Sequence, residues 1–280
     1  MNKKQIIYSA NDRLDDNIFK IFKHTLHEIK SYKWQIWIAF KKDFVASYSH
    51  TAMGFIWSII LPLIPISAYV MLAQFRVLKT TDAMPFIAYI LIGFTIWFFL
   101  TNTITTIMNS LRREKGILTK IKYPLSAVVL SHFGKLMFDL LVRVFFSFAI
   151  LILYDINIGL HLLALVFLLI PLILFSFGVG LILLVLSEIY RDITNFTDIF
   201  FRYGMFVSSV IFPMPNIELI QKINLFNPFN TYVVNIREFI VFGTFSDINL
   251  FLYTSLFSLF IFVIAIKFIY VMENRLKAYL

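Results

Sequence analysis

Four long stretches of this chain contain no charged residue and are long enough to cross a lipid bilayer. They run over residues 54–75, 86–111, 160–187 and 248–266. A helix of about 20 apolar residues spans the roughly 30 Å hydrocarbon core of a membrane. Backbone N–H and C=O groups find no water in that core, so stretches of this kind enter it as helices. The feature predicts an all-α, polytopic membrane protein.

Two further stretches are apolar but carry charge. Residues 126–154 contain Lys135, Asp139 and Arg143, and residues 199–213 contain Arg202. Both are too apolar for a surface that faces water, so they are either membrane-spanning or deeply buried. We count them as spans, which gives six predicted membrane-spanning helices.

The segment between the fifth and sixth spans, residues 214–247, is apolar but interrupted. Pro215, Asn227-Pro228 and Gly243 divide it into pieces that are too short to cross. Short helices are tolerated at membrane depth where protein or a water cavity satisfies their backbone. We therefore predict a re-entrant hairpin on the outer side.

Residues 1–50 differ from the rest and form a predicted N-terminal segment, ahead of a transmembrane domain over residues 51–280. Residues 27–48 place aromatic and aliphatic side chains among lysines. This pattern predicts an amphipathic helix in the cytoplasmic headgroup layer, with lysines near lipid phosphates. A helix packed on a partner protein is an alternative, compatible with the first.

The basic residues predict the orientation of the chain. It is 60% hydrophobic and only 15% charged, which excludes an ordinary soluble enzyme. Its net charge of +9 lies beside apolar runs, so it indicates membrane orientation and not nucleic-acid binding. Of the 25 Lys and Arg residues, 17 fall on the side of the two termini and 4 in the opposite loops. Both termini are predicted to be cytoplasmic.

Catalytic motifs are absent from the sequence. It contains no cysteine and no GxxxxGK[ST] motif for nucleotide phosphates. The HExxH and GxSxG motifs are missing as well. His24 and His27 share one helical face, but on a segment exposed to water we interpret them as solvated. We predict no catalytic residue, no metal site and no cofactor in this chain.

Lys135, Asp139 and Arg143 are spaced four residues apart, which places all three on one face of a helix. Ionisable groups at membrane depth usually face protein or water and often mark a transport path. Two interpretations remain open for this charged ladder. It makes a paired contact between helices, or it lines a polar translocation route.

Eight short motifs follow one another from about residue 40 to the C-terminus. In order they are Tyr48 with Gly54, Trp57 and Pro62; Gly93; Trp97 with Phe98; Pro124 after KIKY; Tyr190-Arg191-Asp192; Pro213 after VIF; Asn227-Pro228; and Arg237. Their order and spacing resemble the ABC-2 type permeases that export polysaccharides. The Arg-Asp loop and the outer proline region are more similar to O-antigen and teichoic-acid exporters than to group 2 capsule exporters.

The resemblance implies a transport subunit in the inner membrane, with no ATPase site of its own. It implies a homodimer bound to two ABC ATPase subunits, which bind ATP and Mg²⁺ and drive export of a lipid-linked polysaccharide, as in lipopolysaccharide biosynthesis. Residues 112–124 and 188–194 would contact the ATPase. The implied coupling residues are Arg112, Arg113, Lys115, Lys120, Glu188, Arg191 and Asp192. The implied lipid-headgroup residues are Lys30, Lys33, Lys41, Lys42 and Arg112, although anionic lipid would attract them equally.

Aromatic residues supply the predicted conduit for the glycan. A polymer that slides needs shallow contacts without fixed register, and ring faces provide them. The candidates are Trp57, Tyr69, Trp97, Phe98, Phe206 and Phe212; packing in the core is the alternative for each. Other substrates also remain open: teichoic acid, capsule, a small lipid or a drug. A channel unrelated to ABC transporters is a further alternative.

Overall fold

The computed structural model describes residues 13–14, 16–49, 53–75, 84–118, 124–154, 156, 159–214 and 217–279. No strand occurs in these ranges, so the all-α prediction is confirmed for them. The elements, in chain order, are α1 (Ile18–Ser31), α2 (Lys33–Tyr48), η1 (Gly54–Ile56), α3 (Trp57–Gln74), α4 (Phe86–Met108), α5 (Ser110–Leu118), α6 (Leu125–Leu153), η2 (Leu160–Ala164), α7 (Leu165–Ile189), α8 (Asp192–Val207), α9 (Glu218–Leu225), α10 (Pro228–Phe242) and α11 (Ile248–Tyr279).

The six predicted spans correspond to α3, α4, α6, α7, α8 and α11. Within the described residues, four helices are long and apolar enough to cross a membrane: Phe86–Met108, Leu125–Leu153, Leu162–Ile189 and Ile248–Glu273. α3 and α8 are shorter, with 18 and 16 residues. α8 stops at Val207 because the chain turns there, so the apolar residues up to 213 continue as non-helical chain.

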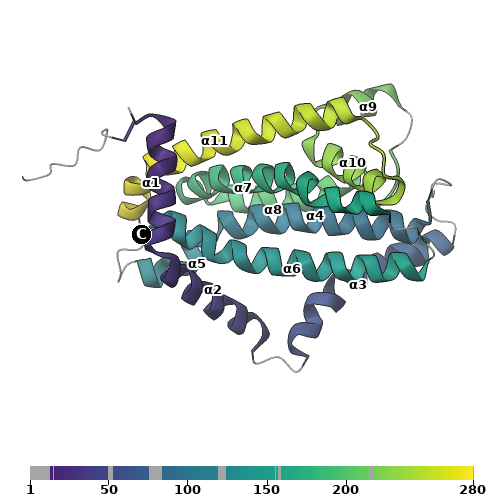
Figure 1. Cartoon of the computed structure of the whole chain (residues 1–280), viewed down its shortest axis with the longest axis horizontal. Coiled ribbons are helices and arrows are strands. Elements are labelled where there is room, and N and C mark those ends of the chain that lie inside the picture. The colour runs from purple at the N-terminus through teal and green to yellow at the C-terminus, as the bar shows by residue number, and fades with distance from the viewer. Residues whose placement is uncertain are drawn as a thin grey trace, which may run out of the picture.

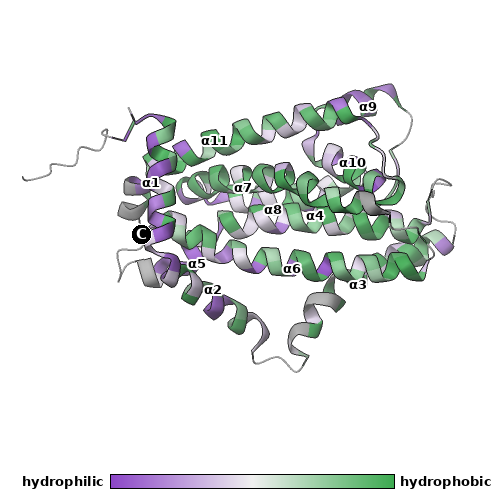
Figure 2. Ribbon diagram, in the orientation of Figure 1, coloured by the Kyte–Doolittle hydropathy of each residue, from purple (hydrophilic) through white to green (hydrophobic). Residues whose placement is uncertain are grey.

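The long helices run side by side, with α1 and α5 at one end of the bundle and α9 and α10 toward the other (Figure 1). α4 is the most enclosed of them. The buried share of its most apolar window is 78%, compared with 33% for α7, 22% for α6 and 17% for α11. The helices around α4, namely α6, α7 and α11, are apolar along most of their length (Figure 2). Their exposed apolar sides therefore face lipid or other protein, while α4 forms the core.

The amphipathic helix predicted over residues 27–48 is two helices in the structure. α1 begins earlier, at Ile18, and the chain bends at Tyr32 (φ −103°, ψ 16°) before α2. α1 packs against α6 and α11, and α2 packs against α6. α1 separates its apolar and polar faces more cleanly than α2, because Trp34 and Trp37 leave α2 apolar on its exposed side.

The two ends of the described chain meet at the same end of the bundle. Arg13 Nη1 donates to Glu273 Oε2 at 2.7 Å, and its guanidinium lies 4.6 Å from the centroid of the Tyr270 ring. Hydrogen bonds from Lys20 and Tyr270 lower the pKa of the Asp16 carboxyl. Six membrane crossings, an even number, would return the chain to the side on which it started, in agreement with these contacts.

Residues 214–247 contain α9 and α10, two helices too short to cross, as expected from the breaks in this segment. The Asn227 side chain accepts from the backbone N–H groups of Phe229 and Asn230 at 3.1 and 3.3 Å, and Pro228 occupies the first helical position. Both features stabilise a helix start. α10 folds back against α4, which provides the protein contact that a short helix at this depth requires.

Arg237 of α10 is fully enclosed and holds the turn after α8. Its Nη2 donates to the Ser209 carbonyl at 2.6 Å, and its guanidinium lies 3.6 Å from the centroid of the Tyr89 ring. Tyr89 Oη donates to the same carbonyl at 2.9 Å. A Cβ atom at Gly93 would lie 2.7 Å from the Val210 carbonyl oxygen and 2.8 Å from Arg237 Nη2. Glycine at this position therefore lets α4 approach both groups.

We expect Gly93→Ala to destabilise the protein by about 1–3 kcal/mol, the usual range for overpacking a close contact. The measurement is the melting temperature of the purified protein in detergent, followed by intrinsic fluorescence. Gly116→Ala is the control, because a Cβ atom there meets nothing within 4 Å. If Gly93→Ala melts at the wild-type temperature, the packing around Arg237 is looser than described.

Candidate functional site

A cavity of about 500 Å³ lies between α2, η1 and α3 on one side and α4 and α6 on the other. Aromatic rings and charged groups line it together. The lining residues are Ser47, Tyr48, Gly54, Trp57, Leu61, Phe98, Asn102, Lys135, Asp139 and Arg143. Because charges at membrane depth mark polar paths and ring faces suit apolar or sugar surfaces, we take this cavity as the candidate functional site.

The charged lining is the ladder on α6. Tyr48 Oη donates to Asp139 Oδ1 at 2.9 Å, and Lys135 Nζ lies 6.0 Å from the centroid of the Tyr48 ring. The Arg143 guanidinium lies 5.3 Å from the centroid of the Phe98 ring. The ladder thus makes contacts between helices, and the same three side chains line the cavity. The sequence left two interpretations of the ladder open, a contact between helices and the lining of a polar route. In the structure the same face of α6 makes the contacts and lines the cavity.

The predicted conduit residues near the cavity form a row of rings. Trp57 and Phe98 line the cavity itself. The Phe94 ring connects Phe98 to Tyr69, with centroid distances of 5.2 and 5.8 Å. The row extends from the cavity along α4 and α3, although Phe94 itself is 1% exposed and packs in the core.

The other three conduit candidates lie elsewhere. Phe206 and Phe212 form a pair with ring centroids 6.4 Å apart, at the end of α8. Trp97 is 2% exposed and contacts Phe201 and Phe229. Its ring packs in the protomer core, which is the alternative that applied to every aromatic candidate.

Arg112 connects α5 to the end of α7 and the start of α8. Its Nε donates to Glu188 Oε1 at 3.0 Å and its Nη1 donates to Thr194 Oγ1 at 3.0 Å. Its Nη2 donates to the Ser187 carbonyl. The structure thus brings two predicted coupling residues, Arg112 and Glu188, into one cluster and adds Thr194. A guanidinium with three anchored N–H groups has a fixed orientation, so α5 is tied to the α7–α8 turn.

The remaining predicted coupling residues lie at the same end of the bundle. Arg113, Lys115, Arg191 and Asp192 are exposed there. Lys120 lies outside the described residues. Exposure at one end makes these four side chains accessible to a partner.

A second polar cluster joins α2, α5 and α6, and the sequence did not reveal it. His132 is 2% exposed; its Nδ1 is hydrogen-bonded to Asp43 Oδ2, and its Nε2 lies 3.9 Å from Glu114 Oε1. Lys42 Nζ donates to Glu114 Oε2 at 3.4 Å. The hydrogen bond with His132 lowers the pKa of Asp43. A histidine within an apolar span, three residues before Lys135, is the signal that could have pointed to this cluster.

The predicted headgroup lysines, Lys30, Lys33, Lys41 and Lys42, are exposed on α1 and α2. Arg112 is apart from them, held in the cluster with Glu188. In the part of the chain that the structure describes, no three His, Cys, Asp or Glu side chains are grouped to hold a metal ion.

The chain was compared with known proteins. A family model described as ABC-2 type transporter matches residues 34–241. No curated protein matches the chain. The matched region starts in α2 and ends in α10, so it contains the cavity, the ladder and both polar clusters.

If the cavity is hydrated, a cysteine placed in its wall should react with a charged, water-soluble thiol reagent. We expect Asn102→Cys to react and Ile104→Cys, on the same helix but fully buried, to be protected. The natural chain contains no cysteine, so each variant carries a single thiol. Equal reactivity of the two variants would mean that the cavity does not admit water.

Proposed function

Because the chain belongs to the ABC-2 type transporter family, we propose that it is the permease subunit of an exporter for a lipid-linked polysaccharide of the O-antigen type. A permease of this family is a transport subunit that pairs with an ABC ATPase and does not hydrolyse ATP itself. The family assignment sets aside a channel unrelated to ABC transporters. The substrate, the homodimer and the placement in the inner membrane are parts of the proposal.

The observation that carries the proposal is the mixed lining of the cavity. Lys135 and Arg143 provide two positive charges against the single negative charge of Asp139. An excess of positive charge favours the phosphate groups of a lipid-linked glycan. Trp57 and Phe98 offer ring faces in the same cavity, which suit the apolar faces of sugar rings. A small, wholly apolar substrate would not need the charged ladder.

The position of the cavity supports the same substrate. It lies directly beside α2, whose exposed Lys41 and Lys42 belong to the predicted interface helix. A lipid-linked substrate approaches from the headgroup layer, so a cavity next to an interface helix is reached without crossing the hydrocarbon core. The exposed lysines can attract the negative headgroup before it enters.

α8 supports a second copy of the chain. Asn195, Asp198 and Arg202 are exposed on one side of this short helix. Charged side chains at membrane depth normally face protein or water and not lipid. In the proposed homodimer this side of α8 faces the partner permease, together with Phe206, and a central path for the glycan runs between the two copies.

The orientation follows from the basic residues. The end of the bundle with α1, α2 and α5 carries most of the lysines and arginines, which favours the cytoplasmic side for both termini. The two ATPase subunits, which hold ATP and Mg²⁺, would then bind α5 and the α7–α8 turn. The Arg112 cluster ties these two segments together, so a rigid-body movement of the ATPase reaches several spans at once.

The purified chain should show no ATPase activity alone and should support ATPase activity in complex with its partner. We expect Arg113→Glu and Arg191→Glu to lower transport-coupled hydrolysis roughly tenfold, as when a contact of about 1.4 kcal/mol is lost. Lys222→Glu is the control, since Lys222 is exposed on α9 at the opposite end. Robust hydrolysis by the chain alone, or unaltered coupling in both variants, would contradict the proposed division of labour.

Export is tested by surface display of the polymer at matched protein levels. The double variant Trp57→Ala with Phe98→Ala should lower display severalfold, because it removes two ring faces from the cavity. Arg143→Gln should lower it as well, because it removes charge complementarity to phosphate. Phe145→Ala is the control, as Phe145 lies on α6 but is 69% exposed and faces away from the bundle. Unchanged display in both cavity variants would reject the cavity as a substrate site.

A further inference from the structure

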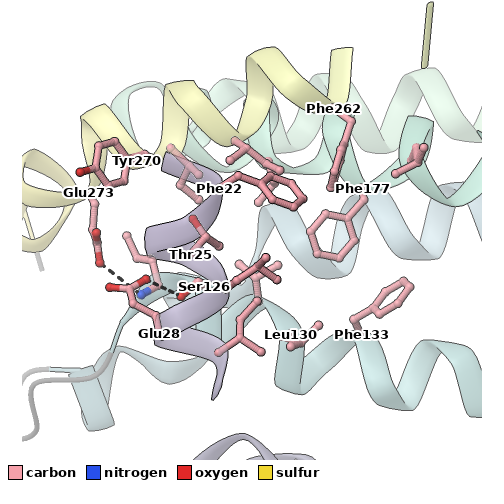
Figure 3. A pocket seen from close by; sticks show the side chains of 18 of the residues that line it. Phe22, Thr25, Glu28, Ser126, Leu130, Phe133, Phe177, Phe262, Tyr270 and Glu273 are labelled. Atoms are coloured by element: carbon pink, nitrogen blue, oxygen red, sulfur yellow. Dashed lines mark hydrogen bonds between the residues drawn. The ribbon is translucent and has the colours of Figure 1, made fainter. Parts of the chain in front are cut away.

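A second cavity, with no lining residue in common with the first, lies between α1 and the helices α6, α7 and α11. Its volume is about 290 Å³, and its wall is almost entirely apolar. Three phenyl rings, those of Phe133, Phe177 and Phe262, lie along one end (Figure 3). Leu130 lies between them and α1. We call this cavity the α1 groove.

The α1 groove runs along the spans for about one leaflet of a membrane. On α11 its lining extends from Phe262 to Glu273, a rise of about 16 Å in a helix. This is about half of the roughly 30 Å hydrocarbon thickness. Glu273 is also the residue at which the apolar part of α11 ends. The polar end of the groove therefore coincides with the expected headgroup level, and its apolar end with the depth that an acyl chain reaches.

The polar end of the α1 groove is acidic. Glu28 and Glu273 lie there together with Ser126, as Figure 3 shows. Glu273 is neutralised, because Arg13 donates to Oε2 at 2.7 Å while the Leu125 backbone N–H donates to Oε1 at 3.4 Å.

Glu28 is placed differently. Its Oε2 accepts from Ser126 Oγ at 2.8 Å, and its Oε1 lies 3.9 Å from His24 Nδ1. In the described part of the chain, no lysine or arginine lies within ion-pair distance of Glu28. The groove wall contains no basic side chain either, among the residues that line it. Among the described residues, His24 is thus the one basic side chain near Glu28, and no permanently charged group pairs with it. A carboxylate with no lysine or arginine partner, at the mouth of an apolar groove, disfavours a bare phosphate and favours an ammonium group.

We propose that the α1 groove binds one bilayer phospholipid with an ethanolamine headgroup. One acyl chain lies among Leu130, Phe133 and Phe177, and the ammonium group contacts Glu28. This site is separate from the cavity on the α2–α3 face and holds a structural lipid, whatever substrate the protein exports.

Photo-crosslinking in nanodiscs tests the proposal. The full chain is reconstituted with a trace of phosphatidylethanolamine that carries a diazirine in its acyl chain, and in parallel with the matching phosphatidylglycerol. Labelled peptides are identified by mass spectrometry. We expect the α6 and α7 peptides that line the groove to be labelled, with a preference of about threefold for the ethanolamine lipid, as for one partly exposed ion pair.

Two kinds of variant test the binding of the acyl chain and the binding of the headgroup separately. Leu130→Trp should fill the groove and abolish labelling by both lipids, and Thr25→Trp serves as a second blocking variant on the α1 wall. Glu28→Gln should keep the labelling but reduce the headgroup preference to about one. Leu141→Trp is the matched control on α6, because Leu141 is 67% exposed outside the groove. It should leave both the labelling and the preference intact.

Three results would overturn the proposal. Equal labelling by both lipids in the wild type would reject the ethanolamine headgroup. Labelling that survives both blocking variants would show that it arises outside the groove. No labelling of the groove by either lipid would show that protein occupies it, either another segment of this chain or a second copy. None of these results depends on transport, so they are distinguishable from a failure of the proposed function.

Discussion

The guanidinium of Arg237 lies fully inside the bundle, and a buried charge of this kind is stable only where its surroundings supply hydrogen bonds and polarisable contacts. The Ser209 carbonyl accepts from Nη2 and the Tyr89 ring packs on the guanidinium, while Nε has no hydrogen-bond partner among the described residues. Meeting this requirement fixes three segments relative to one another: α10, which carries Arg237; the turn after α8; and α4, which comes close through Gly93. Loss of the Arg237 hydrogen bond would leave the Tyr89 hydroxyl as the remaining donor to the Ser209 carbonyl and would take this acceptor away from the buried guanidinium, at a cost of about 1–3 kcal/mol.

The same requirement explains the shape of the end of the bundle at which α9 and α10 lie. Ser209 has φ +50°, an uncommon conformation for a residue with a side chain, and the surrounding hydrogen bonds hold it there. Asn227 Nδ2 donates to Ser208 Oγ at 3.1 Å, and Ser209 Oγ donates to Asn230 Oδ1 at 2.7 Å. The α8 helix therefore ends at Val207, and the chain after it is non-helical, with the Ser209 carbonyl as the acceptor for Arg237 of α10. The Ser209 carbonyl and the side chains of Ser208 and Ser209 all have partners in this turn.

At the end of the bundle with α1 and α5, two clusters of polar side chains hold the helices together, in the way that the buried Arg237 guanidinium does at the opposite end. The Arg112 cluster joins α5 to α7 and α8, and the His132 cluster joins α5 to α2 and α6. α5 is thus attached to α7 and α8 on one side and to α2 and α6 on the other, through one half-buried cluster and one that is mostly buried. Tyr48 connects α2 to the ladder on α6, so the wall of the cavity is continuous with the segments that would contact an ATPase. In the proposed function, this continuity lets movement at α5 change the cavity.

The sequence by itself determined the fold class, the approximate helix positions and the shared side of the two chain ends, because apolar length and charge placement act locally along the chain. It also pointed to Gly93, Asn227 and Arg237 one by one, through the family resemblance. Only the tertiary structure decided that these residues meet at one turn, that Trp97 packs in the core while Trp57 lines a cavity, and that His132 pairs with Asp43. These outcomes depend on which faces of distant helices come together, and no local pattern of residues specifies such contacts.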